Sequence, residues 1–351
     1  MSNPHFRLSA SDARLVAEQF GTPLYVYDRK TIHDLADSVL NFPAPFGLTA
    51  RYAMKACPSR AILQILAKKG VRIDASSGFE AERAMQAGIP AHHIQLTAQE
   101  IPSNLAEILA QGVLFNACSL HQLSSYVKLR PNSEVSIRVN PGLGSGHTNR
   151  TNTGGPASSF GIWHEKVEEA LDVARAADVR ISGLHSHIGA GTDPDVWVHC
   201  ADLTLAIAER LPHITRLSLG GGFKIARMQG EKTADLLEIG KKVAERIRKF
   251  KELQGVALHF EVEPGTYLMG NTATLLSSVA DVVDTGPSGY RFIKLNAGMT
   301  EILRPSMYGA QHEIEVVPWN LSQKESDNFI VVGHCCESGD ILTPKAGDPE
   351  S

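Results

Sequence analysis

Residues 48–75, "LTARYAMKACPSRAILQILAKKGVRIDA", contain one complete unit of the pattern that predicts the fold. Segments 48–56 and 71–75 are short runs of mostly apolar residues, which is typical of buried strands. A helical pattern at 59–70 lies between them. A strand, a helix and a second strand in this order favour parallel pairing of the two strands.

The same alternation of apolar runs and helical patterns continues as far as residue 264. About eight such units close a (β/α)8 barrel, so we predict an α/β fold built on a TIM-like barrel. A doubly wound open sheet is the alternative that this alternation allows. The runs expected to be strands are residues 48–56, 71–75, 93–98, 113–118, 134–140, 179–188, 216–221 and 257–264.

After Gly265 the pattern changes to strand-like segments without long helices between them. We therefore predict two domains, a barrel over residues 37–270 and a β-rich domain made of residues 1–36 and 271–351. The early stretch "TPLYVYD" is also a candidate to join the barrel, with Pro23 at an edge or strand start. The expected β-rich segments are residues 272–286, 290–298, 314–320 and 328–340.

The overall composition is that of a soluble globular protein, with 43% apolar and 21% charged residues among 351. The net charge is −4 and no basic block occurs, so neither nucleic acid nor an anionic membrane is expected as a partner. The sequence has no run that could span a bilayer, and no signal peptide is visible at its start. Five scattered cysteines indicate the reducing cytoplasm.

Polar and small residues gather where the predicted barrel strands end, which is where barrels of this kind carry their active sites. The strand interiors are expected to stay apolar. The residues at these ends are Lys55, Asp74, Ser76, Asn140, His185, His187, Gly220, Gly221, Gly222 and Glu263.

Lys55 stands in an otherwise apolar run. A buried ammonium is costly unless it is paired or neutralised, and a lysine that loses its charge becomes an amine nucleophile. The alternative is a lysine that extends to solvent from the strand end.

Two motifs suit a flat ligand that carries a phosphate. Glycines 220–222 let backbone N–H groups approach an anion closely, and loops after the seventh and eighth strands are the usual phosphate site of such barrels. In "HSHIG", His185 and His187 share one face of a strand. They could form a metal pair, stack on a cofactor, or bond to each other in the core. No further cluster completes a metal shell, so we expect no metal.

Three further motifs add groups of defined chemistry. Glu263 at a barrel mouth could hold a pyridinium N–H, or form an ordinary salt bridge. One of the two adjacent cysteines in "GHCCESGD" could donate a proton or act as a nucleophile, or both could be small strand residues, one buried on each face. Arg304 in "LRPSMYGAQHE" could bind a carboxylate with its bidentate fork, or lie in solvent. Together, an amine, an anion cradle, a stacking ring, a carboxylate and an arginine suit pyridoxal phosphate.

These motifs resemble the fold-type III decarboxylases that use pyridoxal phosphate, most closely the diaminopimelate decarboxylase branch, over nearly the whole chain. Residues 140–163, "NPGLGSGHTNRTNTGGPASSFGIW", are especially similar to that branch. The resemblance implies a homodimer with shared active sites and decarboxylation of meso-diaminopimelate to L-lysine. The alternatives are another basic amino acid or a specialised-pathway conjugate as substrate, a non-catalytic relative that binds the cofactor, and a metal-dependent hydrolase using the two histidines.

The resemblance also implies roles for single residues. Lys55 would carry the cofactor, His187 would stack on its ring, and Glu263 would hold its ring nitrogen. Cys336 would return a proton to Cα, reaching in from a neighbouring subunit together with Glu337. The remaining implied contacts are the cofactor phosphate with Gly220, Gly221 and Gly222, the cofactor with Gly265 and Thr266, and the far end of the substrate with Arg304 and Tyr308.

Four features depart from the family pattern. Thr266 stands where the family carries the arginine of Glu-Pro-Gly-Arg, Ala190 replaces a serine, and Asn296 replaces an aspartate. The sequence also ends at Ser351, where relatives continue through more strands. We therefore expect a β-rich domain whose C-terminal part is incomplete, and a changed contact with a phosphate or substrate carboxylate at Thr266.

Overall fold

A computed structural model of the chain describes residues 6–143, 154–187, 189–319 and 327–348. The chain divides into two compact units. What we call the barrel unit comprises residues 32–225 and 232–269, and the sheet unit comprises the described parts of 1–31, 226–231 and 270–351. We propose that these units correspond to the two domains expected from the sequence.

Eight parallel strands close into a ring in the barrel unit. Each strand pairs with the next in the order β2, β3, β4, β5, β6, β8, β9, β10, and β10 pairs with β2. This closure confirms the predicted (β/α)8 barrel. A short strand, β7 (Ile162–Trp163), adds to β6 outside the ring. The ring strands are β2 (Leu48–Ala53), β3 (Arg72–Ala75), β4 (Ile94–Leu96), β5 (Leu114–Ala117), β6 (Glu134–Asn140), β8 (Arg180–His185), β9 (Arg216–Ser218) and β10 (His259–Val262).

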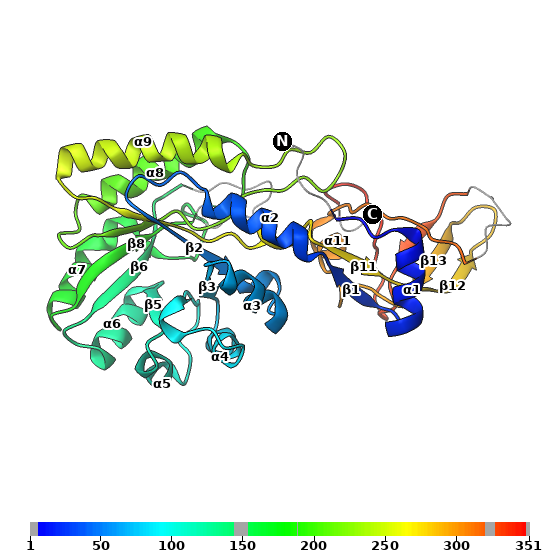
Figure 1. The fold of residues 1–351 in the computed structure, drawn as a ribbon, viewed down its shortest axis with the longest axis horizontal. Coiled ribbons are helices and arrows are strands. Elements are labelled where there is room, and N and C mark those ends of the chain that lie inside the picture. The colour runs from blue at the N-terminus through cyan, green and yellow to red at the C-terminus, as the bar shows by residue number, and fades with distance from the viewer. Residues whose placement is uncertain (1–5, 144–153, 188, 320–326, 349–351) are drawn as a thin grey trace. The chain divides into compact units, whose positions relative to one another are not determined.

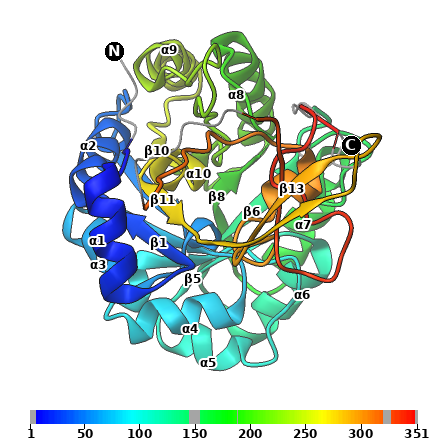
Figure 2. The same cartoon turned by 90° about the vertical axis from the view of Figure 1, so that its right-hand side faces the viewer.

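Helices form an outer ring around these strands (Figure 2). In α3 (Arg60–Lys68), Ile62, Leu63 and Leu66 are buried on one face, because that face packs on the strands and the other meets solvent. The other helices of this part of the chain are α2 (Arg29–Leu40), α4 (Gly78–Gln86), α5 (Leu105–Ala110), α6 (Leu120–Leu129), α7 (Val167–Arg175), α8 (Pro194–Ala208), α9 (Leu236–Gln254) and α10 (Thr266–Met269), with 3-10 turns η1 (Met54–Ala56), η2 (Ala91–His93) and η4 (His164–Lys166).

A buried ion pair links strands of the barrel. Nη2 of Arg51 on β2 lies 3.2 Å from Oε1 of Glu261 on β10. Nη1 of Arg216 on β9 lies 3.7 Å from the same oxygen. Arg51 is 0% exposed and Glu261 is 4% exposed, so each charge depends on the other to compensate for its lost hydration.

The sheet unit contains two small sheets (Figure 1). β1 (Leu24–Tyr27) pairs antiparallel with β11 (Ala273–Leu276). β12 (Val279–Asp284) pairs antiparallel with β13 (Arg291–Leu295), and β13 pairs parallel with β14 (Ile330–Val332). Its helices are α1 (Ala10–Phe20) and α11 (Arg304–Tyr308).

The stretch 22–28, a candidate to join the barrel, forms β1 and pairs with β11 rather than with a barrel strand. One expectation about strands is wrong. The described residues 314–319 form no strand, although their sequence is apolar and β-branched. Val316 is 75% exposed and Trp319 is 61% exposed, so these side chains find no sheet face to pack on, and strand propensity alone does not hold them.

No helix in the described ranges is both long enough and apolar enough to cross a membrane.

Candidate active site

The carboxyl ends of the barrel strands bring several predicted site residues together. Lys55 lies in η1, immediately after β2, and its side chain is exposed. Asp74 lies near the end of β3, His185 is the last residue of β8, and Glu263 follows β10. Because the eight strands are parallel and closed, these ends form one mouth of the barrel.

Glu263 is held by side chains from three different strands. Its Oε2 lies 2.9 Å from Nε2 of His185 on β8. Its Oε1 accepts hydrogen bonds from Nε2 of Gln95 on β4 at 3.2 Å and from Oγ of Ser218 on β9 at 3.1 Å. Only 7% of the residue is exposed, so these contacts fix the position of the carboxyl group at the barrel mouth.

The pKa of Glu263 reflects this setting. Burial by itself raises the pKa of the carboxyl group, but the charge and hydrogen bond of His185, together with the charge of Arg51, lower it. The net result is a pKa of about 2, so Glu263 is ionised at neutral pH. A fixed carboxylate is the acceptor that a pyridinium N–H needs.

Asp74 has the opposite character. Burial raises its pKa well above the usual range, and the nearby charge of Glu263 raises it further, while the charge of Lys55 acts in the other direction. Its Oδ1 has no hydrogen-bond partner among the residues that the structure describes. The mouth therefore holds one carboxyl group with a lowered pKa and one with a raised pKa, a division seen where neighbouring acids take different roles.

The loop after β9 approaches other backbone so closely that only glycine fits. A Cβ on Gly221 would lie 2.1 Å from the carbonyl oxygen of Glu263, and one on Gly222 would lie 1.7 Å from that of Gly189. Gly220 and Gly222 have φ values of +71° and +94°. The packing therefore requires glycine at 221 and 222, and the backbone conformation favours it at 220 and 222.

This loop has donors to offer an anion. The amide N–H groups of Gly221 and Gly222 donate no hydrogen bond within the described part of the chain. Neighbouring amides directed to a common point form the concave surface that binds phosphate in many proteins. The triplet therefore fits a phosphate group on chemical grounds.

His187 lies next to this loop, because a Cβ on Gly220 would approach its Nδ1 to 2.6 Å. Burial lowers the pKa of His187 well below its usual range, and the charges of Arg138 and Lys55 add to the effect. The imidazole is therefore neutral at physiological pH. A neutral ring avoids the cost of desolvating a cation when it packs against a flat cofactor.

The sequence reasoning did not single out Gln95 and Ser218, which hold Glu263. Both lie inside strands, and the expectation that strand interiors stay apolar is wrong at these positions and at Arg51 and Glu261. The signal was available, since a polar residue within a predicted buried strand needs a partner. His185, considered as a metal ligand, instead contacts Glu263.

Arg304 and Tyr308 lie together on α11 of the sheet unit. Both are half-buried. Nη1 of Arg304 lies 3.5 Å from Nε2 of His312, at the outer limit of a hydrogen bond. Burial lowers the pKa of Arg304, but the group remains cationic at neutral pH because a guanidinium group is ordinarily a very weak acid.

Cys336 and Glu337 are exposed in the turn that follows β14. The buried side chain of Asp340 shapes this turn, because it accepts the N–H of Met299 at 2.7 Å and that of Cys335 at 2.9 Å. None of the five cysteines forms a disulfide. The predicted site residues thus fall into two groups. One group lies at the barrel mouth, and the other, Arg304, Tyr308, Cys336 and Glu337, lies in the sheet unit.

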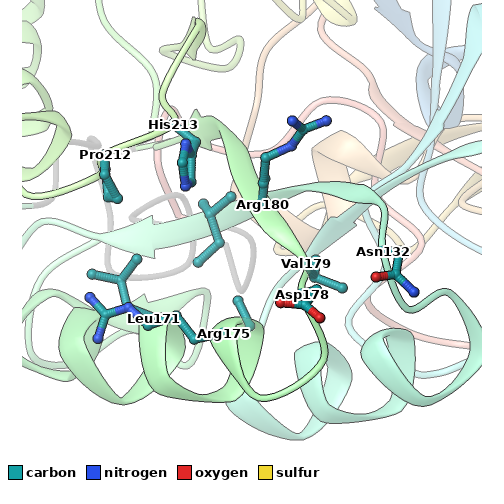
Figure 3. Close-up of a pocket in the computed structure, with 10 residues that line it drawn as sticks. Asn132, Leu171, Arg175, Asp178, Val179, Arg180, Pro212 and His213 are labelled. Carbon is teal, nitrogen blue, oxygen red and sulfur yellow. The ribbon is translucent and has the colours of Figure 1, made fainter.

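A cavity of about 530 Å3 (Figure 3) is lined by none of these residues. Its lining includes Asn132, which precedes β6, and Val179 and Arg180 at the start of β8. It therefore lies by the amino ends of the strands, which in such barrels serve stability rather than catalysis. Its size does not make it the active site.

Fold and site together define an α/β-barrel enzyme whose mouth offers an amine, a fixed carboxylate and a phosphate cradle. The family model of the pyridoxal-dependent decarboxylases, for their pyridoxal binding domain, matches residues 33–270. The chain belongs to this family, which includes ornithine, arginine and diaminopimelate decarboxylases, and it is an amino-acid decarboxylase that uses pyridoxal phosphate.

Named relatives and solved structures agree with this assignment. Diaminopimelate decarboxylase of Streptomyces coelicolor is 33% identical over 95% of this chain and 76% of its own length. The enzyme of Escherichia coli strain K12 is 32% identical over 98% and 84%. A crystal structure of a diaminopimelate decarboxylase superposes with a TM-score of 0.88 at 29% identity, covering 97% of this chain and 81% of that one.

The barrel-mouth residues fit pyridoxal phosphate. The glycine cradle suits its phosphate, the ionised Glu263 suits its ring nitrogen, and the exposed amine of Lys55 is accessible to its aldehyde. The chemistry that the cofactor supplies when bound is an electron sink for the pair left on Cα as carbon dioxide departs.

Proposed function

We propose that the chain decarboxylates meso-diaminopimelate and releases L-lysine. The observation that carries the proposal is Arg304, a half-buried cation on α11 beside a histidine whose pKa is lowered to about 4. A substrate whose far end carries a carboxylate gains a charged hydrogen bond there. Lysine and ornithine have an ammonium group at that end and would be repelled.

The relatives support the same substrate. Proteins named diaminopimelate decarboxylase match nearly the whole chain at 31–33% identity. The Helicobacter pylori diaminopimelate decarboxylase was crystallised with L-lysine, and its structure superposes with a TM-score of 0.84 at 25% identity. The lysine/ornithine decarboxylase of Vibrio vulnificus is 22% identical and supports the fold alone.

Each residue then has a proposed role. Lys55 binds the cofactor and, with Cys336, moves protons at Cα. Glu263 keeps the ring nitrogen protonated, because a carboxylate beside a pyridinium favours its charged form. The other proposed contacts are His187 with the ring, Gly220, Gly221 and Gly222 with the phosphate, Gly265 and Thr266 with the cofactor, and Arg304, Tyr308 and Glu337 with the substrate.

We further propose a homodimer in the cytoplasm, acting in lysine biosynthesis. Cys336 and Glu337 are exposed in the single chain, although their proposed roles require a closed site. Packing of this turn against a neighbouring subunit would enclose both side chains. Five cysteines without a disulfide are compatible with a reducing compartment.

A parallel assay tests the substrate. The full chain, with pyridoxal phosphate in excess, is given meso-diaminopimelate, L-lysine, L-ornithine and L-arginine, and carbon dioxide release is measured. We expect release from the first compound, with L-lysine as product. Release from one of the others and none from the first would overturn the substrate assignment, while no release from any would contradict the catalytic role.

A further inference from the structure

Ser218, the last residue of β9, bonds to two parts of the barrel mouth at once. Its Oγ donates to Oε1 of Glu263 at 3.1 Å and accepts the backbone N–H of Gly220, also at 3.1 Å. Only 3% of the residue is exposed, so solvent does not compete for these bonds. One hydroxyl group therefore joins the carboxylate to residues 220–222, which we call the glycine loop.

The chemistry of the three groups fixes the direction of both hydrogen bonds. A backbone N–H can only donate, and the ionised carboxylate of Glu263 can only accept. The hydroxyl has one proton and gives it to Glu263, while one of its lone pairs accepts from Gly220. Alanine at position 218 would remove the donor and the acceptor together.

Backbone contacts already hold the glycine loop against Glu263. The N–H of Glu263 donates to the carbonyl oxygen of Gly220 at 2.8 Å. The carbonyl oxygen of Ser218 accepts the N–H of Ser186 at 2.9 Å, so the main chain at Ser218 is also held. These contacts fix the main chain, but the side chain of Glu263 can still rotate about its own bonds. The hydroxyl of Ser218 ties that side chain to the loop.

The other contacts of the Glu263 carboxylate come from other strands. Gln95 on β4 donates to Oε1 at 3.2 Å, and its Nε2 also lies 3.5 Å from Oγ1 of Thr97. His185 on β8 contacts Oε2 at 2.9 Å. Ser218, by contrast, lies two residues before the glycine whose N–H it accepts. It is therefore the residue that relates the carboxylate to the glycine loop directly.

We propose that Ser218 is a positioning residue that fixes the Glu263 carboxylate relative to the glycine loop. This inference rests on the proposed function, in which Glu263 contacts the ring nitrogen of the cofactor and the glycine loop contacts its phosphate. The pyridine ring is rigid, so both contacts form together only when the carboxylate and the loop are correctly spaced. Hydrogen bonds behind the binding groups maintain such spacing.

The test is a double-mutant cycle on the full chain, freed of cofactor and titrated with pyridoxal 5'-phosphate by visible absorbance. Its variants are Ser218→Ala, Glu263→Gln and the two combined. Ser218→Thr keeps a hydroxyl group on the same carbon. Ser136→Ala is the matched control, because Ser136 is another buried strand serine, and its Oγ accepts from Nη2 of Arg216 at 3.1 Å.

We expect Ser218→Ala to weaken cofactor binding by about tenfold in the wild-type background and by less than about threefold in the Glu263→Gln background. The second loss is smaller because Ser218 acts through the carboxylate that Glu263→Gln removes. Ser218→Thr should recover most of the affinity, and Ser136→Ala should leave it unchanged. Equal losses in the two backgrounds, or no loss in the wild-type background, would overturn the inference.

The cycle is independent of the substrate assignment, because it measures binding of the cofactor alone. Carbon dioxide release by the wild-type chain is measured separately. If no amino acid is decarboxylated, the proposed function fails, while the binding cycle still decides the role of Ser218.

Discussion

At the scale of single residues, Glu263 and Asp74 are two carboxyl groups whose pKa values the barrel mouth shifts in opposite directions. Glu263 accepts from Gln95 and Ser218 and contacts His185, whereas Oδ1 of Asp74 has no partner within the described ranges. The environment, rather than the residue type, decides the direction in which each pKa shifts. Substitution by the matching amide distinguishes the two groups. An amide resembles a protonated carboxylic acid more closely than it resembles a carboxylate.

Glu263→Gln should therefore weaken catalysis far more than Asp74→Asn. We expect the first change to lower kcat by at least about tenfold, because the ring nitrogen loses its charged partner. The second should alter kcat by less than about threefold, since the raised pKa of Asp74 favours the neutral acid, which the amide resembles. Rate measurements on both holoenzymes at pH 7.5 test this, and equal losses would contradict the assigned charge states.

His312 predicts a pH dependence of stability. Its pKa is about 4 in the folded chain against 6.5 ordinarily, so the unfolded chain binds a proton first as the pH falls. Its contribution to stability is then complete above about pH 6.5 and is lost between pH 6.5 and 4.

The comparison is with His312→Gln, which keeps an acceptor near Arg304 but cannot titrate. The free energy of unfolding of both chains is measured in urea at several pH values. The difference between wild type and variant should move against the wild type as the pH falls from 6.5 to 4. A difference that stays constant over this window would show that His312 titrates normally.

At the scale of elements, the loop after β9 depends on glycine for its path. Gly222→Ala combines a positive φ with a Cβ that would lie 1.7 Å from backbone, so the loop must move. We expect weaker binding of pyridoxal phosphate, measured by absorbance titration, and a lower melting temperature.

Gly255→Ala provides the matched control for this change. Gly255 ends α9 with φ +75°, and no atom lies within 4 Å of its added Cβ. That variant should lose only about 1 kcal/mol from the left-handed conformation and keep its cofactor affinity. Equal cofactor affinity in both variants would argue against a cradle at Gly222.

The strands of the barrel could be predicted from the sequence because each apolar run is short and separated from the next by a helical pattern. All eight expected runs contain a ring strand, although β2 ends at Ala53 and leaves Lys55 in a 3-10 turn. The strand pairing of the sheet unit was harder to predict from the sequence. β1 pairs with β11 about 250 residues away, and no local pattern specifies that partner.

The site residues likewise divide into those that the sequence predicted and those that it did not. Residues with distinctive chemistry at strand ends, such as Lys55, His187 and Glu263, were visible in the sequence. Gln95 and Ser218 were missed since their partner, Glu263, lies on another strand.

At the scale of the whole molecule, the ion pair inside the barrel should matter for stability. Glu261 faces Arg51 and Arg216, so Glu261→Gln leaves buried positive charge uncompensated. We expect a loss of about 3–5 kcal/mol. Lys242→Met, which removes an exposed pair with Asp195, should cost far less, because solvent screens an exposed pair. Urea unfolding measures both, and similar losses would contradict the structural role of the buried pair.

The central claim is that the barrel mouth binds pyridoxal phosphate through Lys55. The most direct measurement is reduction of the holoenzyme with borohydride, followed by peptide mass mapping, for the wild type and for Lys55→Ala. The account predicts one pyridoxyl group per wild-type chain, on the peptide that contains Lys55, and no stoichiometric label on the variant. Stoichiometric labelling of another lysine in Lys55→Ala would contradict it.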